Sequence, residues 1–384
     1  MKPIYLDYNA TTPTDPEVIE TMLPFFYESF GNPSNTLNSY GWTADNAVKS
    51  ASQHVADLVH CTPQELVWNA GATEGNNSVV FGLIHKIKDA HKDEKIHLIT
   101  SRAEHRSVIN SFKAAEKIEN IEVDIIPVNK FGIVTVEELQ KYIKPHTKLV
   151  SLMWVNNEIG SINPIQSLSE FCHKNKIYFH TDATQAIGKI DVNLQTTPVH
   201  FLTFSAHKFY GPKGVGCLFT RSIIQIDPYL FGGGQQKNQR SGTLNVPSIV
   251  GTGKAAQIAK VKMNEESART RNFLITLFNL LKSKIPDLQL NGPAIENVDE
   301  RSPMNLNLTF NKPADLVLPQ LSKIAFSLGS ACSTTEITSS HVLKAIGLTD
   351  SQAQSTIRLS IGRWTTESDI QQASEILLNA FKPL

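Results

Sequence analysis

A lysine and an acid, each directly after an apolar run, carry the clearest chemistry in this chain. Lys208 follows shortly after the run 199–204, and Asp182 follows the earlier run 177–181. An amine in this position can hold an aldehyde as a Schiff base, and a carboxylate can keep a pyridine nitrogen protonated. The pair therefore predicts pyridoxal phosphate (PLP) chemistry with Lys208 as the anchoring amine. A surface lysine and a turn-capping acid are the plainer interpretation.

A glycine turn before a helical pattern is suited to the phosphate of such a cofactor. Gly71-Ala72-Thr73 lies between the short apolar run 66–68 and a segment with helical periodicity. Backbone N–H groups at such a turn, and the positive end of the helix, attract anions. The same tripeptide is common in structural turns, so the phosphate role of Ala72 and Thr73 depends on the cofactor.

Cys332 differs from the other cysteines in its surroundings. It lies in a run of small polar residues from Gly329 to Thr335, which predicts an exposed, mobile loop. A thiolate on such a loop can enter and leave a site. Cys172 and Cys217 lie in helical and strand patterns that predict packed thiols. An incidental loop cysteine is the alternative for Cys332.

Two further side chains have chemistry that the local pattern leaves open. Arg358, in the run 357–360, has the planar guanidinium that binds a carboxylate through two hydrogen bonds. His105 follows the run 96–100 and suits either proton transfer or a structural role. None of the 12 histidines stands in an H-E-x-x-H pattern, so no metal site is expected.

Composition limits the class of protein. The 384 residues include 36 basic and 36 acidic ones, so no net field favours nucleic acid or an anionic membrane. The length predicts two domains. The 4 cysteines show no C-x-x-C pairing, the N-terminus has no apolar signal core, and no transmembrane run is present. A reduced, cytoplasmic chain is expected.

The elements that must position these side chains alternate between strand and helix patterns. Strand-like runs are expected at 66–68, 96–100, 123–128, 149–155, 177–181, 199–204 and 215–220. The alternation predicts an α/β fold with a mainly parallel seven-stranded sheet, at whose strand ends the chemical residues gather. Long helices at 249–263 and 265–284 and an α+β tail follow. We expect a large domain at 15–258 and a small domain made of 1–14 and 259–384.

The ordered set of motifs resembles the cysteine desulfurases, which are class V aminotransferase-like, fold-type I PLP enzymes. The resemblance extends from about Tyr5 to past Arg363 and includes Gly31-Asn32-Pro33-Ser34, Val155 to Gly160, Arg240-Ser241-Gly242-Thr243 and Gly329 to Cys332. It implies that L-cysteine is converted to L-alanine while its sulfur passes to Cys332 as a persulfide. The long segment after Cys332 resembles the group with an extended catalytic loop. The implied sulfur uses are iron–sulfur clusters, tRNA thiolation and DNA phosphorothioation.

The resemblance also implies roles for single residues. Besides Lys208 and Asp182, the implied cofactor contacts are Ala72, Thr73, His105, Asn157, Gln185, Ser205 and His207. His105 would stack on the ring and transfer protons, and Thr243 would reach the phosphate from the partner of a homodimer. The implied substrate contacts are Arg358, Asn32 and Asn157. A sulfur-acceptor protein is the further partner expected.

Two features depart from the family pattern. Asn35 follows Gly-Asn-Pro-Ser where many relatives carry a histidine, and the chain ends at Leu384 without the longer tail that helps housekeeping members dock a scaffold protein. Three alternatives remain: an aminotransferase, a selenocysteine lyase, or a non-catalytic subunit of a sulfur-transfer system. An aminotransferase would not need Cys332.

Overall fold

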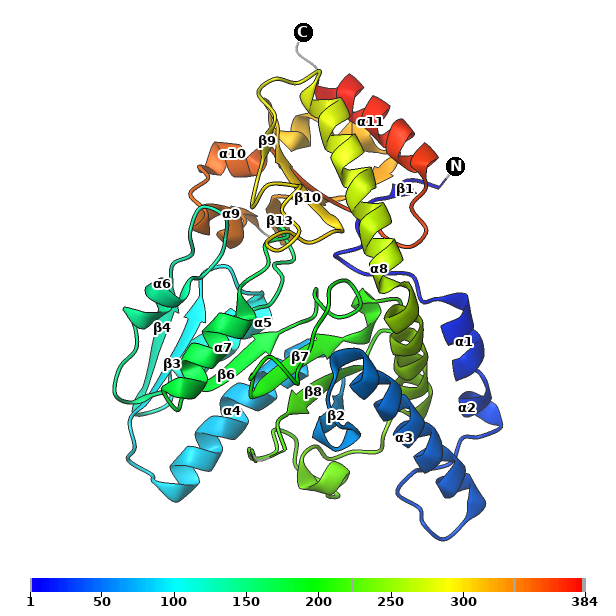
Figure 1. Cartoon of the computed structure of the whole chain (residues 1–384), viewed down its shortest axis with the longest axis vertical. Helices are drawn as coiled ribbons and strands as arrows, with labels where there is room; N and C mark the ends of the chain where they lie inside the picture. Colours follow the sequence, from blue (N-terminus) through cyan, green and yellow to red (C-terminus); the bar gives the residue numbers. More distant parts are fainter. Residues whose placement is uncertain (1, 223, 334–335, 382–384) are drawn as a thin grey trace.

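A seven-stranded sheet is the largest element of the computed structural model, which describes residues 2–222, 224–333 and 336–381, with the backbone alone between 330 and 338. The strand order is β2 (Leu66–Asn69), β8 (Gly216–Thr220), β7 (Phe201–Ser205), β6 (Tyr178–Asp182), β5 (Thr147–Ser151), β3 (Ile96–Ser101) and β4 (Ile121–Ile126). Neighbouring strands are parallel except at β8, which is antiparallel to both β7 and β2. The mainly parallel sheet predicted from the sequence is confirmed (Figure 1).

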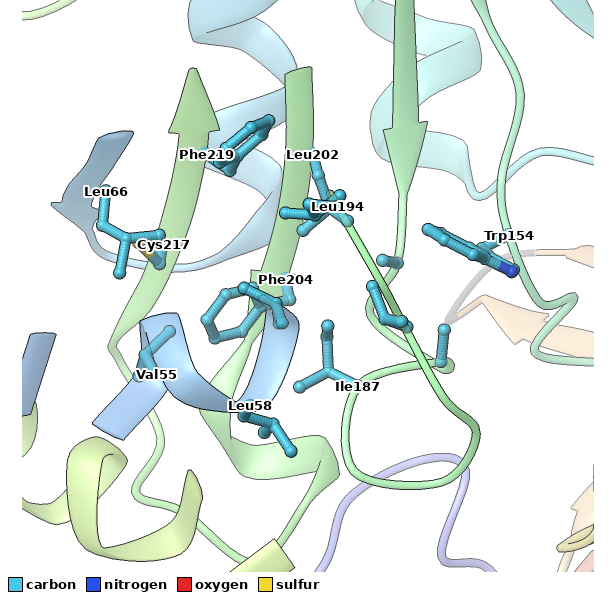
Figure 2. Close-up of a cluster of buried hydrophobic side chains, with 14 of the residues drawn as sticks. Val55, Leu58, Leu66, Trp154, Ile187, Leu194, Leu202, Phe204, Cys217 and Phe219 are labelled. Carbon is cyan, nitrogen blue, oxygen red and sulfur yellow. The ribbon is translucent and has the colours of Figure 1, made fainter. Parts of the chain in front are cut away.

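Helices cover both faces of this sheet. On one face, α4 (Ala72–Ala90) and α5 (Arg106–Ala115) pack against strand residues that include Leu98 and Phe201. On the other face lie α3 (Ser39–Val59), α7 (Ile165–Lys174) and the first part of α8 (Val246–Lys282). Figure 2 shows part of the second cluster, with Val55 and Leu58 of α3 beside Phe204. Since the central strands are buried on both faces, their sequences are nearly continuous apolar runs.

A smaller sheet lies at the other end of α8 (Figure 1). Its order is β12 (Ser327–Leu328), β15 (Thr356–Ser360), β10 (Asn305–Thr309) and β9 (Gln289–Leu290). The second half of α8, the 3-10 helix η4 (Ala314–Leu321) and α11 (Glu367–Phe381) share a separate apolar core with it. The N-terminal strand β1 (Ile4–Tyr5) pairs in parallel with β11 (Ile324–Ala325) and so joins this smaller part.

Four short elements connect β12 to β15 along the described parts of the segment that carries Cys332. Strands β13 (Ser330–Ser333) and β14 (Glu336–Ser339) form an antiparallel pair. Helices α9 (His341–Ala345) and α10 (Asp350–Gln354) follow. On the sheet side, α6 (Val136–Gln140) separates β4 from β5 along the chain.

Local structure differs from the prediction in three places. The pattern of residues 15–30 predicts a single helix, but the structure divides it into α1 (Pro16–Met22) and α2 (Pro24–Tyr27), because Pro24 lacks the N–H that would continue it. The two helices expected after Ser248 form the single helix α8, since neither Gly nor Pro interrupts residues 254–282. The backbone of Cys332, expected in an irregular loop, lies in β13 opposite Ile337, because the segment folds back on itself as a hairpin.

The described residues contain neither a membrane-spanning helix nor a metal-binding cluster. No helix there has the length and apolar character needed to cross a bilayer. Within the same ranges, no cluster of three or more His, Cys, Asp or Glu side chains is arranged to hold a metal ion.

Candidate active site

A pocket of about 400 Å³ lies where β6 and β7 end, next to the loops that follow β3 and β5. Its walls come from both parts of the molecule: Asn9 and Ala10 from the N-terminal segment, Arg358 from β15, and the remainder from the large sheet and its helices. Most residues that the sequence singled out line it: Ala72, Thr73, His105, Asn157, Asp182, Gln185, Ser205, His207, Lys208 and Arg358. The fold thus brings together side chains that are far apart in sequence.

Lys208 ends the one-turn 3-10 helix η2 (Ala206–Lys208) that follows β7. Its Nζ donates hydrogen bonds to the backbone oxygens of Asn9 and Ala10, each at 2.6 Å. Burial, and secondly the positive charge of Arg358, lower the pKa of Lys208 to about 8. A larger fraction of this amine is therefore neutral near pH 8 than for an exposed lysine.

Asp182 is the last residue of β6, and its side chain is buried. One carboxylate oxygen, Oδ2, accepts from Asn76 Nδ2 at 3.0 Å, and Oδ1 accepts from the backbone N–H of Thr184 at 3.0 Å. Asn76, on α4, also donates to Ser107 Oγ at 2.9 Å and accepts from Thr203. The carboxylate is therefore held in one orientation at the wall of the pocket.

The turn into α4 also lines the pocket. Gly71 has a φ of +142°, and a Cβ at this position would lie 3.1 Å from Ser205 Oγ. The backbone N–H of Ala72 donates to Ser205 Oγ at 2.8 Å. Burial, with nearby Lys208 and Lys213 as further causes, lowers the pKa of His207 to about 4, and its Nδ1 lies 3.0 Å from Thr11 Oγ1.

These features fit pyridoxal phosphate. A helix N-terminus with a glycine that leaves the turn open suits the phosphate group, and it lines the same pocket as Asp182, whose carboxylate suits the ring nitrogen. Thr184 Oγ1 is buried and has no hydrogen-bond partner among the described residues, as expected of a wall that faces a ligand. Lys208 lies at the same pocket and supplies the amine.

His105 caps α5 at the pocket. Its Nδ1 accepts from the backbone N–H of Ser107 at 3.1 Å and lies 2.7 Å from Ser107 Oγ. This acceptor role places the ring proton of a neutral His105 on Nε2. Although the side chain is exposed at the pocket mouth, desolvation by the surrounding chain lowers the pKa of His105, while Asp182 opposes that shift.

Arg358 is held on two sides. Its guanidinium donates to Asp7 Oδ1 at 2.8 Å, to Ser327 Oγ at 2.7 Å and to the backbone oxygen of Asn157 at 3.0 Å. Arg358 Nε is buried and has no partner among the described residues. The plane of the guanidinium is thus fixed before any substrate binds.

Two of the predicted site residues are not brought to this pocket, and the side chain of a third is not among the described parts. Asn32 is exposed in the turn after α2, where its Oδ1 accepts from the N–H of Ser34 at 3.0 Å. Thr243 is exposed beside Arg240, whose guanidinium pairs with Glu74 at 2.8 Å. The backbone of Cys332 lies in β13, and its side chain is outside the part that the structure describes.

Sequence reasoning missed the residues that hold the others in place. Asn9, Asp7 and Asn76 contact Lys208, Arg358 and Asp182, yet each stands more than 100 positions from its partner. Asp7 and Asn9 belong to the motif Tyr5 to Pro13, with which the family resemblance begins, and this resemblance was the available signal. For Asn76 the sequence offered no signal except its position in the helical pattern after Gly71.

Comparisons with known proteins point to one family. The model of the family "Aminotransferase class-V" matches residues 4–373. The mitochondrial cysteine desulfurase of Eremothecium gossypii is 41% identical over 96% of this chain and 74% of its own length. The cysteine desulfurase IscS of Rickettsia typhi is 39% identical over 100% of this chain and 92% of its own. A solved NifS-like protein has a TM-score of 0.87 and 32% identity, covering 98% of this chain and 99% of its own.

Proposed function

The chain belongs to the aminotransferase class-V family and is a PLP-dependent cysteine desulfurase, and we propose that Lys208 anchors its cofactor and that Cys332 receives the sulfur of L-cysteine. One observation carries the assignment of the cofactor site. An amine with a pKa lowered to about 8 and a buried carboxylate with fixed orientation line the same pocket, beside the N-terminus of α4.

The roles proposed for the pocket residues follow from their contacts. When bound, the cofactor supplies a conjugated ring that stores the electron pair left as the substrate Cα–H bond breaks. Asp182, held by Asn76 and Thr184, would keep a proton on the pyridine nitrogen. The Lys208 amine, whose pKa is lowered to about 8, would take the proton from Cα.

Arg358 would bind the carboxylate of L-cysteine. Asp7 and Ser327 hold one edge of the guanidinium, and Nε has no partner among the described residues. Since Arg358 comes from β15 and Lys208 from the large sheet, a substrate bound to both would span the two parts of the molecule. Such fixed placement reduces the entropy lost on reaching the transition state.

Cys332 would act at the sulfur atom. Its thiolate would attack the sulfur of bound L-cysteine, so that an S–S bond forms as the C–S bond breaks. The electron pair of the C–S bond would remain with the substrate carbon, which takes up a proton, and L-alanine leaves. Support comes from the base of the hairpin. The N–H of Gly329 donates to the oxygen of Thr356 at 2.8 Å, two residues before Arg358 on β15. The hairpin that carries Cys332 thus starts beside the strand that carries the proposed substrate ligand.

The other cysteines are poor candidates for this step. Burial raises the pKa of Cys61 and of Cys172 to about 12. Burial also raises the pKa of Cys217 well above its ordinary value. Because the thiolate is the reactive form, these three thiols are nearly inert near neutral pH.

Mass spectrometry after incubation with L-cysteine tests the assignment. We expect one added sulfur on Cys332 and none on Cys61, Cys172 or Cys217. Cys332→Ala should still bind PLP, and should still exchange the Cα proton of L-cysteine, but should form no persulfide. Cys61→Ala is the matched control and should react as the unchanged protein does. Persulfide on another cysteine, or alanine production that persists in Cys332→Ala, would contradict the role of Cys332 and favour another class V activity.

We also propose a homodimer. Phe26, Tyr27, Phe30, Leu37 and Trp42, here called the apolar patch, lie close together in the sequence around α2 and the start of α3, and each is more than half exposed. Large apolar side chains exposed together in one region are typical of a protein interface. Asn32 stands between Phe30 and Leu37 in the sequence, and Thr243 does not line the pocket of its own chain. We therefore assign both residues to the site of the partner subunit.

The remaining proposals concern organisation and partners. The two separate apolar cores support a division into a large domain, 15–258, and a small domain made of 1–14 and 259–384.

An open hollow beside β14 and α9 is lined by basic side chains, which would suit an acidic sulfur-acceptor protein. These are Arg102, Arg106, Lys113, His341 and Lys344. A cytoplasmic location and a role in iron–sulfur cluster assembly are part of the proposal, and the free thiols Cys61, Cys172 and Cys217 are compatible with a reducing compartment.

A further inference from the structure

Lys189 is a buried lysine, and the two charged groups that lower the pKa of its amine, Lys208 and Arg358, are both positive. It lies in the turn after β6 and is 4% exposed, a burial that is rare for lysine unless the charge is paired. Burial, then the charges of Lys208 and Arg358, lower the pKa of Lys189 to about 7. Placing such a group here costs folding free energy, so a role beyond packing is indicated.

The hydrogen bonds of Lys189 lead directly to the pocket. Its Nζ donates to Gln185 Oε1. Gln185 in turn donates from Nε2 to the backbone oxygen of Asn9 at 2.9 Å, and the same oxygen accepts from Lys208 Nζ at 2.6 Å. Gln185 lines the pocket, whereas Lys189 lies behind it.

This arrangement leaves the amide of Gln185 only one orientation. A primary amide has one acceptor oxygen and two N–H donors. Lys189 occupies the oxygen and Asn9 takes one N–H, which leaves the second N–H available to a ligand in the pocket. Without a donor at position 189, the amide oxygen would lose its partner, and only the bond to Asn9 would oppose rotation of the amide by about 180°.

We propose that Lys189 is a positioning residue that acts through Gln185, fixing the amide so that an N–H meets the phenolic oxygen of the cofactor. The inference deepens the proposed function and rests on it, because the family resemblance implies that Gln185 contacts the cofactor. A donor at the phenolic oxygen stabilises its negative charge. The acidity of the bound cofactor therefore depends on a residue outside the pocket wall.

The test is the pH titration of the visible absorption of the PLP-loaded protein. Lys189→Met keeps the length and apolar stem of the side chain but removes the donor. We expect the midpoint of the absorption change to rise by about one pH unit, the size of one hydrogen bond to a charged oxygen. Lys189→Gln removes the charge but keeps a donor, and it should return the midpoint most of the way to that of the unchanged protein.

A double variant separates positioning from a general structural effect. If Lys189 acts through Gln185, adding Gln185→Met to Lys189→Met should move the midpoint no further. An unchanged midpoint in Lys189→Met, or fully additive shifts, would overturn the inference. If Lys189→Met does not fold, two other variants provide the test. Gln185→Met should raise the midpoint, and Lys189→Gln should leave it near its original value. Failure of either expectation would overturn the inference. Failure of the unchanged protein to bind PLP would instead overturn the proposed function.

Discussion

The reactivity of Lys208 is set by the few groups around its amine. Burial and the Arg358 guanidinium lower the pKa of Lys208 to about 8. Only the neutral amine attacks an aldehyde, so the rate at which the apoprotein captures PLP should rise with pH and level off above about pH 8. Stopped-flow absorbance measures this rate. Arg358→Met removes a charge that opposes protonation, and it should move the midpoint upward.

The outcome that would contradict this account of Lys208 is a capture rate that still rises at about pH 10.4, the ordinary range of an exposed lysine. Borohydride reduction of the loaded protein and peptide mapping provide the matching check, since the label must be on Lys208. Label on Lys189 or Lys213 would assign the amine to another residue.

Asp182 allows a test of charge at nearly constant shape. Asp182→Asn keeps the size of the side chain but cannot hold a pyridine proton by its charge, so turnover of L-cysteine should fall by about 100-fold or more. The altered contacts with Asn76 and Thr184 should lower the free energy of unfolding by only about 1–3 kcal/mol. Steady-state kinetics and thermal unfolding measure the two effects. Asn76→Ala keeps the carboxylate and should lose less than about 10-fold; near-normal turnover in Asp182→Asn would refute the role.

At the scale of elements, the turn from β2 into α4 requires glycine. Gly71 has a φ of +142°, and an added Cβ would come within 3.1 Å of Ser205 Oγ, the atom that binds the N–H of Ala72. Gly71→Ala should therefore distort the phosphate end and weaken PLP binding by about 10-fold, or about 1.4 kcal/mol. Equilibrium dialysis measures the affinity.

Gly347→Ala is the control for the turn. Gly347 also has a positive φ, +96°, but an added Cβ there meets no atom within 4 Å. The substitution shares the backbone strain and lacks the contact with Ser205, so stability should fall while PLP affinity stays unchanged. Equal losses of affinity in both variants would show that strain alone, and not the turn before α4, is responsible.

An element can be predicted from the sequence when neighbouring residues alone determine it. The runs that became β2, β3, β6 and β7 are apolar and bounded by turn residues, so they were visible in a single sequence. Pro24 was an equally local signal for the end of α1. The contacts of Asn76 with Asp182 and of Asp7 with Arg358 exist only once distant segments meet, and no local pattern encodes them.

At the scale of the molecule, the pocket needs both halves of the fold. Asn9, Ala10 and Arg358 belong to segments that pack with the smaller sheet, whereas Asp182 and Lys208 belong to the large one. Arg363 joins these parts, pairing with Asp15 at 2.5 Å and Glu266 at 2.6 Å while its guanidinium lies 4.1 Å from the ring centre of Tyr210. Movement between the parts would therefore alter the distance between the proposed anchor and the proposed substrate ligand.

The proposed dimer makes the last prediction, because the pocket of one chain lacks Asn32 and Thr243. Phe30 is 64% exposed in the apolar patch, and Phe30→Asp would place a charge in an interface that excludes water. We expect the variant to sediment as a monomer, to bind PLP at least about 10-fold more weakly, and to lose most of its turnover. Val298→Asp is the control: Val298 is 60% exposed in the smaller part of the fold, away from the patch, and its substitution should leave mass and activity unchanged. A fully active Phe30→Asp monomer would show that each chain completes its own site, and the assignment of Asn32 and Thr243 to the partner would be wrong.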